Sequence, residues 1–180
     1  MSALRLINET NITSTVSSVD ITDIFNSDYD IYKIQANGIS TSGTTHGTLS
    51  LRLLNTSGSV VSDSVYDYAF LFMAPNTSFT DEKATGQTKF NYSLAYFTDQ
   101  APETNFATFY FFNPFSSSSY TFMLGMSGSS YAGIHRLQKY IGVYKNTSSV
   151  GGIRIVADET VSSGTIQTYG LRVDSYWQGV

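Results

Sequence analysis

Short runs of apolar and aromatic residues, each closed by Gly, Ser, Asn or Pro, recur along the whole chain. Runs of this length are typical of strands and are too short for most helices. Residues 48–54 show the pattern most clearly, since Leu49, Leu51 and Leu53 share one side of an extended chain. Residues 29–36 also alternate between two sides. The pattern therefore predicts an all-β protein built from half-buried antiparallel strands.

About nine or ten strands are expected from the spacing of the turn residues. The first is expected over residues 4–8 and 12–18, with a turn at 9–11, and residues 19–25 are expected to be a short connection. The polar residues 77–88 are expected to be the longest loop and a candidate contact region. The other strands are predicted at residues 29–36, 48–54, 66–74, 89–97, 106–113, 120–126, 134–144, 152–157 and 164–173.

The chain length of 180 residues fits a single domain, because β-sandwiches and barrels of this size commonly have one core. No amphipathic helix separates the predicted strands, which favours a sandwich of the jelly-roll kind over a βαβ fold. We therefore predict one antiparallel β-sandwich domain over residues 1–180. Residues 1–12 and 175–180 are expected to be docking segments.

Charge is scarce in this chain, and that limits the classes of partner. Only 13% of the residues are charged, and the formal net charge is −4. Ten Lys and Arg residues that form no run argue against nucleic-acid binding. No apolar window approaches the length of a membrane span, so no membrane contact is expected.

Catalytic and cofactor motifs are sparse. The sequence has no cysteine and two histidines, His46 and His135, and it lacks the Gly-x-Ser-x-Gly elbow of serine hydrolases. The neighbouring acids Asp99 and Glu103 are the closest approach to a glycosidase pair, and adjacency in sequence is weak support for one. Residues 26–30 resemble a calcium loop without its Gly and distal Glu, and a turn is the favoured interpretation. The protein is therefore expected not to be an enzyme and to need neither cofactor nor metal.

Aromatic residues make up 14% of the chain, and one strand carries them on both sides. In residues 106–112, Phe109 and Phe111 project to one face, whereas Phe106, Tyr110 and Phe112 project to the other. Apolar groups on both faces suggest cover by a loop, a third layer or another subunit. The residues expected at an interface are Leu4, Leu6, Ile7, Phe109, Phe111, Tyr176 and Trp177.

The chain resembles the small jelly-roll virion proteins of tailed bacteriophages. The resemblance spans about residues 28–173 and consists of strand and turn patterns without catalytic content. The segments that carry it are residues 28–34, 49–53, 66–69, 87–90, 99–103, 141–143 and 164–173.

The resemblance implies a virion structural protein that is made in the bacterial host cytoplasm. A capsid decoration or cement protein is expected, bound to the major capsid protein or to other virion proteins. The alternative is a tail or fibre module that binds a host glycan or receptor. The aromatic residues on both faces suggest a homo-oligomer, with a trimer as the guess.

Overall fold

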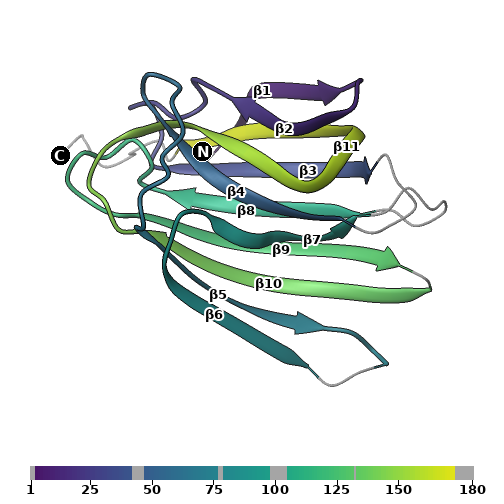
Figure 1. Ribbon diagram of the computed structural model, residues 1–180. Coiled ribbons are helices and arrows are strands. Elements are labelled where there is room, and N and C mark those ends of the chain that lie inside the picture. Colours follow the sequence, from purple (N-terminus) through teal and green to yellow (C-terminus); the bar gives the residue numbers. More distant parts are fainter. Residues whose placement is uncertain (1–2, 42–46, 77–78, 98–104, 132, 173–180) are drawn as a thin grey trace.

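The protein folds as an antiparallel β-sandwich in which one long strand belongs to both layers (Figure 1). The computed structural model describes residues 3–41, 47–76, 79–97, 105–131 and 133–172. These residues form eleven strands, and no helix occurs among them. The expected all-β, jelly-roll-like sandwich is therefore confirmed.

The larger layer has eight strands and the smaller layer has four, with β11 shared between them. The large sheet has the order β1 (Ala3–Ile12), β11 (Val150–Arg172), β3 (Ile31–Thr41), β8 (Phe106–Phe112), β9 (Thr121–Tyr131), β10 (Ile134–Tyr144), β5 (Tyr66–Met73) and β6 (Thr80–Gln87). The small sheet has the order β2 (Val16–Ile21), β11, β4 (Gly47–Asn55) and β7 (Phe90–Phe97).

Strand β11 connects the layers because its two halves pair with different neighbours. Its first half pairs with β2 on one edge and β4 on the other, and its second half pairs with β1 and β3. The change of partners falls around residues 158–160. All of these pairings are antiparallel, so a single hydrogen-bonded network passes from one layer into the other.

The core lies between the layers and is unusually rich in tyrosine. Tyr66 of β5 lies edge-on to Phe90 of β7, with ring centroids 4.9 Å apart. Its hydroxyl accepts a hydrogen bond from the Leu53 backbone N–H at 3.1 Å and donates one to the Val61 carbonyl at 2.9 Å. The hydroxyl of Tyr140 on β10 donates to the carbonyl of Asn91 on β7 at 2.9 Å. Each ring therefore fills the core while its polar end is hydrogen-bonded.

Several sequence-based boundaries were wrong. Residues 77–88 were expected to be a loop, but residues 80–87 form the edge strand β6, whose polar side chains face solvent. The first turn was placed at residues 9–11, but β1 continues to Ile12 and β2 begins at Val16. Residues 152–157 and 164–173 were treated as two strands, but residues 150–172 form the single strand β11. The edge strand β6 was missed because its residues are polar and show no apolar alternation. Strand β11 was predicted as two strands because acidic residues near its bend interrupt its apolar runs.

Close packing inside the sheet depends on a glycine at one position. A Cβ at Gly125 of β9 would overlap the ring of Phe109, its direct neighbour on β8. We expect Gly125→Val to lower the free energy of unfolding by about 1–3 kcal/mol, because a packed ring must move. Leu124→Val on the same strand faces outward and should change it by less than about 0.5 kcal/mol. Urea denaturation measures both, and equal effects would contradict this packing.

Buried tyrosines should make the fold sensitive to alkali. Desolvation raises the pKa of Tyr66 and of Tyr140 far above the usual 10.0. Below about pH 10 both hydroxyls are neutral in the folded and the unfolded chain, so these two tyrosines add no pH dependence to the stability. As the pH rises further, only the unfolded chain ionises, so each tyrosine should lower the free energy of unfolding by about 1.4 kcal/mol per pH unit.

The test compares the wild type with Tyr140→Phe by urea denaturation between neutral pH and pH values above 10. The variant should lose about 1–3 kcal/mol at neutral pH, because the Asn91 carbonyl loses its hydrogen bond. It should also show a shallower decline in alkali than the wild type. If the free energy of unfolding fell equally steeply with pH in the variant and in the wild type, a contribution of Tyr140 to the alkaline loss of stability would be contradicted.

Candidate docking face

The outward side of the large sheet, called the outer face below, carries a broad apolar band that Lys33 of β3 interrupts. Side chains along a strand alternate between its two faces, so those that do not point into the core lie on this outward side. The register aligns these side chains in rows that cross the sheet. Two adjacent rows are largely apolar. The apolar residues of the first row, from β5 to β1, are Ala69, Ile141, Leu124, Tyr110, Tyr169 and Leu6. Those of the second row, from β10 to β1, are Val143, Phe122, Phe112, Ile31, Leu171 and Leu4.

Many of these side chains are open to solvent. The exposed fraction is 55% for Ile141 and 50% for Phe122, and Met126 in a neighbouring row reaches 52%. Seven strands spaced about 4.8 Å apart and two rows, each about 6.6 Å deep, give this apolar band an area of about 400 Å². A patch of this size is comparable to the largest apolar patch of a monomeric protein, which is often functional, so the outer face has the character of an interaction site.

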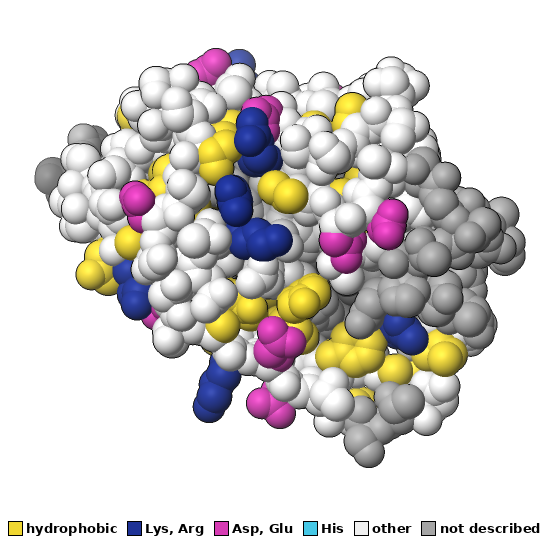
Figure 2. Space-filling view, in the orientation of Figure 1, with side chains coloured by type: hydrophobic (Ala, Val, Ile, Leu, Met, Phe, Trp, Pro, Cys, Tyr) yellow, Lys and Arg dark blue, Asp and Glu magenta, His cyan; other side chains and the backbone are white. Residues whose placement is uncertain are grey.

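The opposite side of the sandwich is different. Figure 2 views the molecule from the small-sheet side, where polar side chains predominate and charged groups are scattered between them. Arg154 of β11 lies there between Arg52 of β4 and Asp20 of β2. Its guanidinium forms a two-pronged ion pair with Asp20, and this raises the pKa of Arg154. The two outward surfaces therefore differ, and only the large sheet presents a broad apolar one.

One end of the outer face is hollowed. A cavity of about 620 Å³, called the hollow below, opens between β6, β5, β10, β9 and β8. Ala69 has the smallest side chain in its row, whereas Ile141 stands beside it and Phe122 lies in the next row on β9. The outward side chains of its lining are Asp67, Ala69, Lys83, Thr85, Phe112, Phe122, Leu124, Ile141 and Val143.

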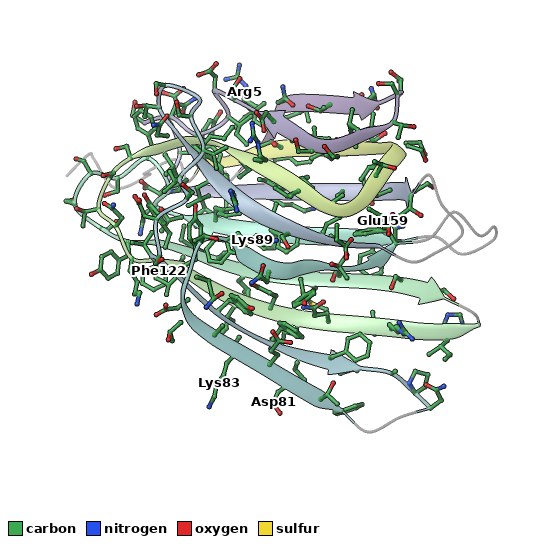
Figure 3. The ribbon with its side chains drawn as sticks, viewed as in Figure 1. Arg5, Asp81, Lys83, Lys89, Phe122 and Glu159 are labelled. Carbon is green, nitrogen blue, oxygen red and sulfur yellow. The ribbon has the colours of Figure 1, made fainter. Side chains whose placement is uncertain are left out.

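The charges at the hollow are not equivalent. Asp67 pairs with Lys145 at 2.8 Å and accepts a hydrogen bond from the Gly86 N–H at 2.7 Å. The Lys145 contact holds the pKa of Asp67 below its usual value. Lys83 projects from the edge strand β6, as Figure 3 shows, and is exposed. The hollow is thus an apolar space with a neutralised acid and a cation on its rim.

The predicted interface residues are distributed unevenly. Leu4 and Leu6 are exposed on β1 and belong to the outer face, whereas Ile7 lies at a bulge and packs against the core. Phe109 and Phe111 are 1% and 0% exposed, so their burial between the layers leaves them unavailable to a partner. The outward aromatic residues of β8 are Phe106, Tyr110 and Phe112. Tyr176 and Trp177 lie outside the described residues.

The sequence analysis missed the part of the outer face formed by β9 and β10. Phe122, Leu124 and Met126 alternate with core residues along β9, as Ile141 and Val143 do along β10. The sequence does indicate an apolar outward face here, since apolar residues occur at both odd and even positions of these segments, as they do in residues 106–112. It was weaker because glycine and serine occupy part of the inward set on β9.

The candidates for chemistry have structural roles or fall outside the description. Asn26 Oδ1 accepts a hydrogen bond from the Asp28 N–H at 2.9 Å, which is a turn contact. His135 is exposed on β10, and His46, Asp99 and Glu103 lie outside the described residues. No group of three or more acids and histidines in the described ranges is placed to hold a metal ion. In the same ranges, no helix has the length and hydropathy to cross a membrane.

Comparison of the chain with protein-family models, with curated proteins and with solved structures gives no match. The outer face and its hollow are therefore interpreted from their own geometry.

We expect polar substitutions on the outer face to leave the fold intact. Phe122→Asn with Ile141→Asn should lower the free energy of unfolding by about 2–3 kcal/mol and leave unfolding cooperative, because each side chain buries about half of its surface. Binding of the hydrophobic dye ANS to the native protein should fall, since the hollow loses two of its walls. Cooperative unfolding of the variant together with unchanged dye binding would contradict the role of the hollow.

Proposed function

We propose that the protein is a non-enzymatic structural protein of a phage virion, and most specifically a decoration protein that stabilises the head. The observation that carries the proposal is the apolar outer face of the large sheet. The whole face of the sheet, polar residues included, measures about 800 Å², which matches what one partner contributes to a standard protein–protein interface. A surface of this kind serves a protein that functions while bound to another protein.

The partner is a protein surface of the virion shell, with the major capsid protein as the first candidate. A shell offers the same surface many times, so one particle can carry many copies of the protein, and the affinity of a single copy sets the occupancy of each site. Leu124 and Tyr110 are direct cross-strand neighbours near the middle of the outer face. Groups at the centre of an interface contribute most to affinity because they lose contact with water completely.

The test is a change of charge at this centre. Leu124→Glu should lower occupancy on virion particles at a given protein concentration about tenfold or more, because a buried unpaired carboxylate costs more than 1.4 kcal/mol. Ser18→Glu on β2 is the matched control, since Ser18 is exposed on the small sheet. Thermal unfolding of both variants should be close to that of the wild type.

Occupancy is measured by sedimenting particles with added protein, and immunogold labelling locates the protein on the particle. Full occupancy by Leu124→Glu would contradict docking through the outer face. A location on the tail would contradict the decoration role. Saturable binding of host surface polysaccharide by the isolated chain would favour the alternative, a receptor-binding module, over a decoration protein.

A further inference from the structure

We propose that the hollow on the outer face binds a single-chain aliphatic anion, a molecule with one unbranched alkyl tail and a negatively charged head such as a carboxylate. The tail would lie along the hollow, and the head would pair with Lys83 at its β6 end. The inference goes beyond the virion role and does not depend on it, because it rests on the lining of the hollow alone.

The shape of the hollow suits one extended chain. Its lining runs from β6 to β8, which is four strand spacings or about 19 Å. The outward side chains of the lining come from two adjacent rows of the sheet, with Thr85 at the bulge of β6. The volume of about 620 Å³ is within the range of ligand sites. A long and narrow space of this kind fits an alkyl chain better than a compact ring system.

The walls of the hollow match such a chain chemically. From β10 to β8, every outward side chain of the lining is a hydrocarbon. These side chains are Ile141, Val143, Phe122, Leu124 and Phe112. Ile141 and Phe122 are about half exposed, so an alkyl tail laid against them would remove apolar surface from water. The tail is therefore expected between β10 and β8.

The charges lie at the other end, on β5 and β6. Asp67 is already paired with Lys145 and accepts the hydrogen bond from the Gly86 N–H. Lys83 is exposed, and no ion pair or hydrogen bond joins its ammonium group to another described residue. Asp81, the next outward residue of β6, is exposed and is not part of the lining (Figure 3). The uncompensated charge of the lining is thus the cation of Lys83, which favours an anionic head at this end.

A ligand in the hollow would cover only part of the outer face. The two rows would remain open from Tyr110 on β8 to Leu6 and Leu4 on β1. Binding of the anion is measured on the purified chain without virion particles. The two proposals can therefore hold together, and each can fail without the other.

The first test is a series of alkyl carboxylates titrated into the wild type by isothermal titration calorimetry below their micellar concentrations. Octanoate, decanoate and dodecanoate should bind with one site per chain. Each added methylene should lower Kd by about two- to fourfold, where fourfold corresponds to complete burial of the group. Decanol and decyltrimethylammonium, which lack the negative charge, should bind more weakly than decanoate.

The second test separates the head from the tail. Lys83→Gln should raise the Kd of decanoate about two- to fivefold, as expected for loss of one exposed ion pair, and should leave the gain per methylene unchanged. Lys33→Gln is the matched control, because Lys33 lies in the same row five strand spacings, or about 24 Å, from β6. At that separation salt screens its charge from the head, so its Kd should equal that of the wild type.

The third test narrows the hollow itself. Ala69→Leu places a larger side chain on its floor and should raise the Kd of decanoate about fourfold or more, the loss of at least two methylene contacts. Thr108→Leu makes a comparable change on the same face outside the hollow and should have no effect. Circular dichroism checks that both variants retain the β-structure, and Lys83→Gln, on an exposed edge, decides the result if Ala69→Leu does not.

Three outcomes would overturn the proposal. The first is the absence of saturable decanoate binding to the wild type. The second is an affinity that is independent of chain length or as high for decanol as for decanoate. The third is an equal loss of affinity in Lys83→Gln and Lys33→Gln, which would place the head away from β6.

Discussion

The fold depends on the hydrogen bonds of β11, because this strand lies within both sheets. A central strand has partners on both edges, and β11 has different ones along its two halves: β2 and β4 first, then β1 and β3. The small sheet is thereby held over the large one, and a common core forms between Tyr66, Phe90 and their neighbours. Without the bend in β11 the two layers would not face each other.

The unequal size of the layers explains where the candidate site lies. Four strands cover the inward side of eight, and the other side of the large sheet has no layer among the described residues. A protein that worked alone in water would place polar residues there, as the small sheet largely does. Instead, Phe122 and Leu124 of β9 lie on this side next to Ile141 of β10. The outward side of the large sheet, against which no second layer packs among the described residues, is therefore the surface best suited to bind a partner.

The sequence predicted the strands better than their connections. The alternation of Leu49, Leu51 and Leu53 locates β4 correctly, because burial of one face imposes a period of two. Residues 80–87 were taken for a loop because an edge strand with both sides wet shows no such period. At β8, alternation separated Phe109 and Phe111 from Phe106, Tyr110 and Phe112, but it could not say which set faces the core. The set that the sequence analysis assigned to an interface is the buried one.

The sequence alone therefore determined the class of the protein, because short alternating runs between turn residues permit antiparallel strands and little else. Only the tertiary structure decided which apolar residues are core and which are surface. The reason is physical, since alternation divides a strand into two faces but burial depends on whether a second layer lies against one of them. The row from Leu171 to Phe122, and the hollow beside it, arise from strands far apart in sequence that long-range pairing brings into register.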